Sequence, residues 1–203
     1  MANNADEKRI KILETAKRRF AHYGMAKTTM AEIAKDLSFS KALLYYYFPD
    51  KNSLYAAVLE HVIGECQMNV IQSIEKAGSV IEGINKVLEI GMEFKKRYFY
   101  LLEYTILMRK ELPEELENLI IESFESQRKA VEMVFSRGVE TEEIRTNNVE
   151  ETARIFIFGT LGMRMLSVLK DFKNDFIPDK SEFDEILSMQ KKLAEIFVAG
   201  LKV

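Results

Sequence analysis

The sequence predicts an all-α protein of about nine helices, and three observations favour helix over sheet. The 203 residues include only three prolines and nine glycines, so few positions interrupt a helix. Apolar residues recur at three- and four-residue spacing, which is the period of an amphipathic helix. Capping signals stand before several of these segments. With 47% apolar residues, the chain is long enough to bury a sizeable core, as one large or two modest domains.

The first predicted helix covers about residues 6–23, with an apolar face and a basic face. Gly24 is expected to end it, because glycine accepts the left-handed backbone conformation that terminates many helices. A second, short helix follows Thr29 and runs to about Leu37. Its sequence TTMAEIAKDL contains a capping box, in which Thr29 and Glu32 satisfy each other's backbone N–H groups.

A third helix is predicted in the stretch SKALLYYYFPDK, which begins at Ser40. Ser40 is a natural N-cap, and Phe48 should close the helix because the residue before Pro49 is biased away from helical geometry. Asp50 can then cap a new helix that begins at Lys51. Two short helices joined by a tight turn, after a longer helix, predict a helix-turn-helix, whose second short helix enters the major groove of DNA.

Residues 9–60 resemble the N-terminal domain of the tetracycline-repressor (TetR) family of bacterial transcription regulators. The resemblance is carried by RIKILETAKRRF, HYG, TTMAEIAKDL, SFSKALLYYYF and DKNSLYAAVLE in this order and spacing. The family usually has Ala-Gly where this chain has Leu37-Ser38. Glycine favours the backbone geometry of this turn, which is less favourable for serine by about 1 kcal/mol. Leu43 also stands where polar or small residues are common. The resemblance implies a DNA-binding domain at residues 1–52 and a helical ligand-binding and dimerisation domain at residues 53–203.

The third helix is expected to read DNA by this resemblance, with Leu44 and Phe48 as its anchors. Lys41 can donate a hydrogen bond to guanine, whereas Tyr46 and Tyr47 are expected at phosphates. The alternative is that the three tyrosines pack a small core, although the apolar spacing assigns that role to Leu44 and Phe48. The expected DNA contacts are Lys27, Thr29, Ser40, Lys41, Ala42, Leu43, Tyr45, Tyr46, Tyr47 and Lys51.

The charge is unevenly distributed along the chain, whose net charge is −3. Residues 1–55 contain ten lysines and arginines against six acidic residues, a net charge of +4 that leaves −7 for the remainder. A basic head on an acidic body suits a protein whose head meets phosphate, although mixed solvated faces could also produce this asymmetry.

The remaining helices are predicted from apolar spacing and caps, the latter including Ser79 with Glu82 and also Asn148. They cover about residues 51–77, 80–97, 114–139, 149–172 and 181–201, with a further short helix between residues 98 and 112. The helix from residue 149 is apolar nearly all round and must be covered on both sides. Together with the last helix it is expected to form a homodimer interface that includes Gly159, Gly162, Leu166, Ile186, Met189, Leu193, Ile196 and Phe197.

An effector pocket between helices is expected in the body, lined by aromatic residues and methionines. Its candidates are Phe94, Tyr98, Tyr104, Met108, Phe124, Met163 and Arg164. Ordinary core packing is the alternative for each of them. Arg164 is the most informative candidate, because a guanidinium among apolar neighbours needs a carboxylate or a ligand anion. A glutamate of a second subunit would serve equally well.

No catalytic constellation, phosphate loop or cofactor motif stands out, so we expect neither an enzyme nor a cofactor. His61 and Glu65 lie at i, i+4 and could share a metal, but two ligands do not make a site. Cys66 could sense oxidants, although a buried inert thiol is the favoured interpretation. The single cysteine excludes an intramolecular disulfide framework, and the absence of a leader or a long uncharged apolar span predicts a cytoplasmic protein without membrane contact.

The sequence therefore predicts a dimeric transcription regulator that responds to a small apolar or amphipathic effector. A repressor that binds a palindromic, inverted-repeat operator as a dimer is the favoured form of this hypothesis. The alternative is an all-helical carrier or sensor of amphipathic molecules that acts through a protein partner and not through DNA.

Overall fold

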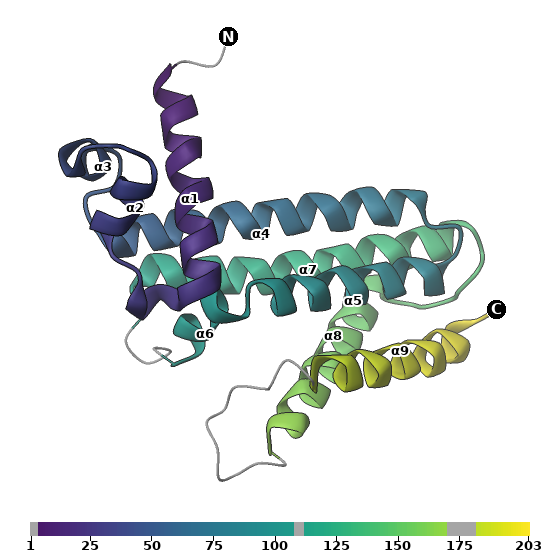
Figure 1. Ribbon diagram of the computed structural model, residues 1–203. Coiled ribbons are helices and arrows are strands. Elements are labelled where there is room, and N and C mark those ends of the chain that lie inside the picture. The colour runs from purple at the N-terminus through teal and green to yellow at the C-terminus, as the bar shows by residue number, and fades with distance from the viewer. Residues whose placement is uncertain (1–3, 108–111, 170–181) are drawn as a thin grey trace. The chain divides into compact units, whose positions relative to one another are not determined.

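The computed structural model describes residues 4–107, 112–169 and 182–203, and within these residues it contains nine α-helices (Figure 1). For a few residues inside helices, including Tyr104, Arg164 and Leu166, only the backbone is described. The helices are α1 (Asn4–Lys27), α2 (Met30–Asp36), α3 (Lys41–Tyr47), α4 (Lys51–Lys76), α5 (Val80–Arg97), α6 (Phe99–Leu107), α7 (Glu114–Glu140), α8 (Val149–Leu169) and α9 (Glu182–Leu201). The prediction of an all-α fold is confirmed.

The chain divides into two compact units, which we call the head unit and the body unit. The head unit comprises residues Met1–Glu65 and Arg97–Leu119, and the body unit comprises Cys66–Lys96 and Ile120–Val203. None of the helices in the described ranges combines the length and the apolar character that a bilayer crossing requires.

The head unit is built on α1, which packs against both α2 and α6. Phe20 of α1 and Tyr55 of α4 are fully buried and make an edge-to-face contact, with ring centroids 5.5 Å apart. The Tyr55 hydroxyl donates a hydrogen bond to the backbone carbonyl of Leu101 in α6. A segment that follows α5 in the chain therefore completes the core of the head.

The α1 helix is interrupted at Gly24, as the sequence predicts. Gly24 has φ 77° and ψ 168°, a backbone region that is essentially restricted to glycine. The Thr28 hydroxyl donates a 2.9 Å hydrogen bond to the Gly24 carbonyl. This break redirects the chain from α1 into α2.

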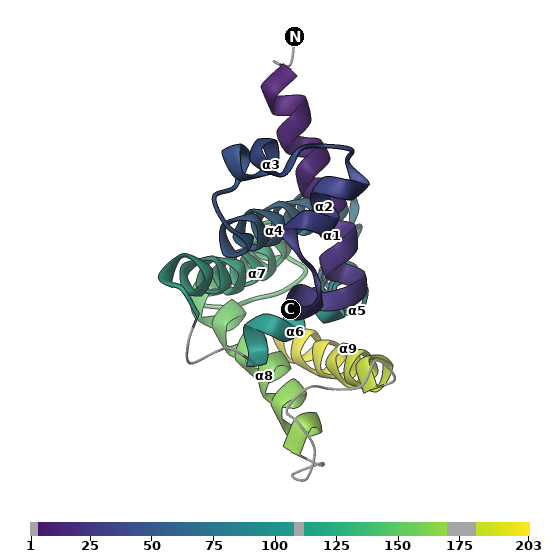
Figure 2. The ribbon, with the colours of Figure 1, turned by 60° about the vertical axis from the view of Figure 1, so that its left-hand side comes forward.

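The body unit has one continuous apolar core, to which α5, α7, α8 and α9 contribute. Phe135 of α7 stacks on Phe197 of α9 at 6.0 Å and meets Phe156 of α8 edge-on at 6.1 Å. The helices α8 and α9 lie side by side (Figure 2). The Lys191 ammonium lies 2.6 Å from Glu89 Oε1, a salt bridge that joins α9 to α5 and lowers the pKa of the Glu89 carboxyl.

Candidate nucleic-acid interface

The turn between α2 and α3 presents the candidate recognition helix. Thr29 and Glu32 form the predicted capping box at the start of α2: the Thr29 hydroxyl accepts from the Glu32 N–H at 3.3 Å, and the Thr29 N–H donates to the Glu32 carboxylate at 2.9 Å. At the end of α2 the Phe39 N–H donates to the Ala34 carbonyl at 2.9 Å, and the Ser38 N–H donates to the Lys35 carbonyl. This pair of bonds is the Schellman arrangement, and it places Ser38 in the left-handed region with φ 55°.

Helix α3 is capped and anchored as the sequence predicts. The Ser40 hydroxyl accepts a hydrogen bond from the Leu43 N–H at 3.1 Å, and the helix closes at Phe48. Leu44 and Phe48 are buried, with exposed fractions of 0% and 4%, and the Arg9 guanidinium lies 5.4 Å from the centre of the Phe48 ring. Seven residues are too few for a stable isolated helix, so these anchors hold α3 in place.

The opposite face of α3 is exposed. Tyr46 is 81% exposed and Tyr45 is 48% exposed, and Lys41 and Ala42 are also exposed. Tyr47 and Leu43 are half-buried, and the Tyr46 and Tyr47 rings meet edge-on at 5.3 Å. The core interpretation of the tyrosines therefore does not hold for Tyr45 and Tyr46.

The remaining predicted DNA contacts lie around the same helix-turn-helix. Lys27, Thr29 and Ser40 are exposed. Lys51 is half-buried, and its ammonium donates to the backbone carbonyls of Met25 at 3.0 Å and Thr28 at 3.1 Å. Sequence reasoning missed this role of Lys51 as a tie between α4 and the end of α1, since the contact joins residues more than twenty positions apart.

Ion pairs fix α2 against α1 behind this surface. Arg19 makes a two-bond contact with Asp36, at 2.6 Å from Nε and 3.0 Å from Nη2, and also approaches Glu32 at 3.5 Å. The hydrogen bond from Arg19 lowers the pKa of the Asp36 carboxyl. Asp50 accepts from the Ser53 N–H at 2.7 Å and caps α4 as predicted, which lowers the pKa of its carboxyl.

The predicted pocket residues fall in both units. Tyr98 is buried in the head unit, whereas Phe94 and Met163, both half-buried, and Phe124, 40% exposed, belong to the body unit. Met108 and the side chains of Tyr104 and Arg164 lie outside the described residues. The effector pocket therefore stays a prediction.

The predicted dimer residues differ in exposure. Ile186 is fully buried and Phe197 packs within its own chain, whereas Ile196 is 65% exposed. Met189, Leu193 and Gly162 are half-buried, Gly159 is exposed, and Leu166 lies outside the described side chains.

Two exposed apolar residues of α8 were not singled out from the sequence: Ile155 and Phe158 are 56% and 64% exposed. The all-round apolar character of the α8 sequence is the signal that could have found them.

Burial raises the pKa of the Cys66 thiol, although Lys95 acts in the opposite direction. A raised thiol pKa disfavours the reactive thiolate. The direction of this shift favours the interpretation of Cys66 as an inert thiol over that of an oxidant sensor.

Residues 12–58 match the model of the family described as "Bacterial regulatory proteins, tetR family". The uncharacterized HTH-type transcriptional regulator YerO of Bacillus subtilis (strain 168) is 31% identical over 144 residues, which cover 66% of this chain and 49% of YerO. The chain thus spans about half of the length of this curated relative.

Solved structures share the fold over nearly the whole chain. A transcriptional regulator from Cytophaga hutchinsonii ATCC 33406 has a TM-score of 0.82 at 25% identity, covering 95% of this chain and 97% of that one. The transcriptional regulator FadR from Bacillus subtilis, in complex with stearoyl-CoA, has a TM-score of 0.65 at 19% identity, covering 95% and 98% of the two chains. The prediction of a TetR-like fold is confirmed. The matched domain, the relatives and the nine-helix fold of the described residues identify in this chain a helix-turn-helix domain of the TetR family, a family of bacterial transcription regulators that are not enzymes.

Proposed function

We propose that this chain is a ligand-responsive transcription regulator that binds an inverted-repeat operator as a homodimer and acts as a repressor in the cytoplasm. The observation that carries the proposal is the exposed face of α3, where Tyr46 is 81% exposed while Leu44 beneath it is fully buried. A large ring held in solvent by a rigid, capped helix is positioned for a partner and contributes nothing to the core.

The DNA contacts are assigned to residues 1–52, and the response to the effector and dimerisation to residues 53–203. Lys41 stands in the first turn of α3, where recognition helices contact base edges. Tyr46 and Tyr47 follow one turn later, where a phenolic hydroxyl can donate to a phosphate oxygen. Two of the three Lys51 donors are engaged by backbone carbonyls, which leaves one for a phosphate.

The dimer is assigned to the exposed apolar residues of α8 and α9, among them Phe158 and Ile196. One recognition helix contacts too few bases for specificity, and a two-fold axis would present two of them to successive half-sites. A stearoyl-CoA complex in the structurally similar FadR supports an amphipathic effector for the body, because it is an apolar chain with a charged end. The effector would release the protein from DNA to the extent that it binds the conformation unable to bind the operator more tightly than the conformation that binds it.

The DNA assignment is tested by selecting bound duplexes from a random pool and measuring their affinity by fluorescence anisotropy. Tyr46→Ala is expected to weaken binding by about 1 kcal/mol, roughly fivefold, if one phosphate hydrogen bond is lost. Tyr23→Ala is the matched control, because Tyr23 is a 52% exposed tyrosine on α1 that is not among the proposed contacts. Lys51→Ala is a poorer choice, since it also removes the tie to Met25 and Thr28.

Two results would contradict the proposal. Equal affinities for Tyr46→Ala, Tyr23→Ala and the wild type would remove α3 from the interface. Failure to enrich any sequence would favour the alternative of a carrier or sensor that acts through a protein partner. For the dimer, Phe158→Asp is expected to yield monomers by sedimentation, whereas Ile121→Asp, at a 60% exposed position of α7, should leave dimers.

A further inference from the structure

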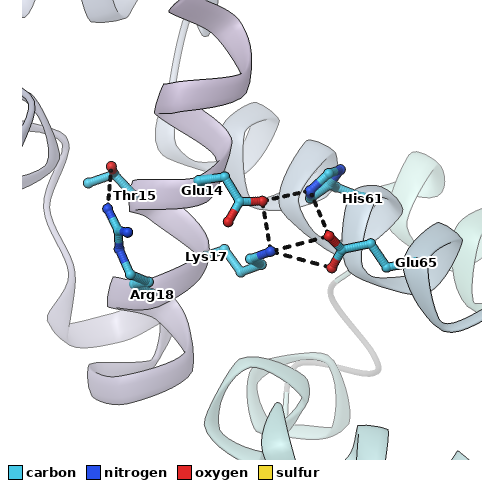
Figure 3. Close-up of polar contacts among 6 residues, drawn as sticks. All are labelled: Glu14, Thr15, Lys17, Arg18, His61 and Glu65. Atoms are coloured by element: carbon cyan, nitrogen blue, oxygen red, sulfur yellow. Dashed lines mark hydrogen bonds and ion pairs between the residues drawn. The ribbon is translucent and has the colours of Figure 1, made fainter. Parts of the chain in front are cut away.

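Four polar side chains join α1 to α4 inside the head unit (Figure 3). Glu14 and Lys17 come from α1, and His61 and Glu65 come from α4. The Lys17 ammonium lies 2.7 Å from Glu14 Oε1 and 3.3 Å from Glu65 Oε2. The His61 ring nitrogen Nε2 lies 2.9 Å from Glu14 Oε1 and 3.4 Å from Glu65 Oε1. The helix-turn-helix surface makes no use of this cluster.

The His61 ring nitrogen is the point on which both carboxylates converge. Carboxylate oxygens only accept hydrogen bonds, so the hydrogen bond to Glu14 places a ring proton on Nε2. A zinc ion with tetrahedral nitrogen and oxygen ligands at about 2.0 Å keeps neighbouring ligand atoms about 3.3 Å apart. The separations of 2.9 Å and 3.4 Å already lie near this value. One ligand atom from each of Glu14, His61 and Glu65 falls within 4.8 Å of the others.

The charges of the cluster also favour a cation. Two carboxylates face one ammonium, so a net negative charge remains when the imidazole is neutral. The Lys17 side chain is only 14% exposed and is itself a cation held between the two carboxylates.

We propose that Glu14, His61 and Glu65 form a binding site for a divalent transition-metal ion of the zinc type, which competes with the Lys17 ammonium. Imidazole with carboxylates is a ligand set that suits Zn²⁺, whereas Mg²⁺ and Ca²⁺ prefer oxygen alone. The ion replaces the proton on Nε2, the neutral ring retains one proton on Nδ1, and water completes the coordination. His61 and Glu65 alone supply two ligands from one helix, and the packing of α1 supplies the third.

Zinc binding to the full-length chain without a histidine tag tests the proposal by isothermal titration calorimetry. We expect one ion per chain, with affinity reduced about tenfold or more in His61→Ala and in Glu65→Gln because each loses a direct ligand. His22→Ala is the matched control, because His22 is the other histidine of the sequence, is exposed and lies on α1. The zinc affinity of this variant should equal that of the wild type. Lys17→Met removes the competing cation and should bind zinc more tightly, on the order of tenfold.

Cobalt(II) gives a second readout, which reports the ligand set at saturating metal. Its visible absorption should appear in the wild type and change in intensity or wavelength in Glu65→Gln, a substitution of nearly equal shape at a 39% exposed side chain. The spectrum should lack a sulfur-to-cobalt charge-transfer band, which would otherwise assign the site to the neighbouring Cys66. No zinc uptake by the wild type, or equal uptake by His61→Ala and Glu65→Gln, would overturn the proposal. An unchanged zinc affinity in Lys17→Met would show that the Lys17 ammonium does not compete with the metal ion.

Discussion

Replacement of Ser38 by glycine should stabilise the protein, although it removes a side chain. Ser38 has φ 55°, a conformation that costs a residue with a Cβ atom about 1–2 kcal/mol. The Schellman bonds from Ser38 and Phe39 hold it there, because they satisfy the carbonyls of Lys35 and Ala34 that the end of α2 leaves without helical partners. Glycine relieves the strain but gains freedom in the unfolded chain, which costs about 0.4–1 kcal/mol. The net stabilisation should be about 0.5–1 kcal/mol.

Thermal unfolding of the full-length protein, followed by circular dichroism, measures this effect. For a chain of this size the expected gain raises the midpoint by about 1–4 °C. Hydrogen exchange at the amides of α2 and α3 should slow in parallel, because the turn belongs to both helix ends. Ser38→Ala is the control: it removes the exposed hydroxyl but keeps the strain, and should lie within about 0.5 kcal/mol of the wild type. A Ser38→Gly protein that is no more stable than Ser38→Ala would refute the left-handed geometry.

Three further predictions concern stability. Gly24→Ala should destabilise the head by about 1–3 kcal/mol in denaturant unfolding, because alanine is strained at φ 77°, ψ 168°; an unchanged midpoint would contradict the break in α1. Gly138→Ala should destabilise the protein by about 1–3 kcal/mol, because the added Cβ would lie 2.3 Å from Val80 Cγ2. Gly64→Ala is the control within α4: its added Cβ would meet nothing within 4 Å, so it should stabilise the protein by about 0.5–1 kcal/mol. A Gly138→Ala protein with a higher unfolding midpoint than Gly64→Ala would refute the packing around Gly138. The lowered pKa of Asp50 stabilises the fold above its unfolded pKa, near 3.8, and this contribution is lost as pH falls through the folded value. The stability of the wild type should therefore fall more steeply than that of Asp50→Asn on acidification in this range, and parallel pH profiles would exclude the carboxylate cap.

Local interactions explain why much of the fold could be predicted. The capping box of Thr29, the Ser40 cap and the Asn148 cap each join residues three positions apart, so their signals stand within a few letters of sequence. Apolar periodicity likewise identified Leu44 as the buried residue of α3. These features depend on residues that are close in the sequence and very little on the tertiary fold.

The parts that sequence reasoning did not reach depend on contacts between distant segments. Periodicity states that a face is buried but not what buries it. The ring of Phe197 stacks on Phe135 of the same chain, and the sequence pattern alone did not name this partner. Glu14 and His61 lie 47 positions apart, and only the packing of α1 on α4 brings them together. Long-range pairing of this kind leaves no mark in one sequence.

The hydrogen bond from Tyr55 to α6 matters for the construction of chimaeric regulators. Tyr55 and Leu101 are both fully buried, and α6 belongs to the same compact unit as the helix-turn-helix. A graft of residues 1–52 onto a foreign protein would leave Phe20 without its native partner ring and α1 without its native support. A transplant that keeps its operator preference should therefore carry residues 97–119 of this chain, or an α6 of matching shape, together with residues 1–65.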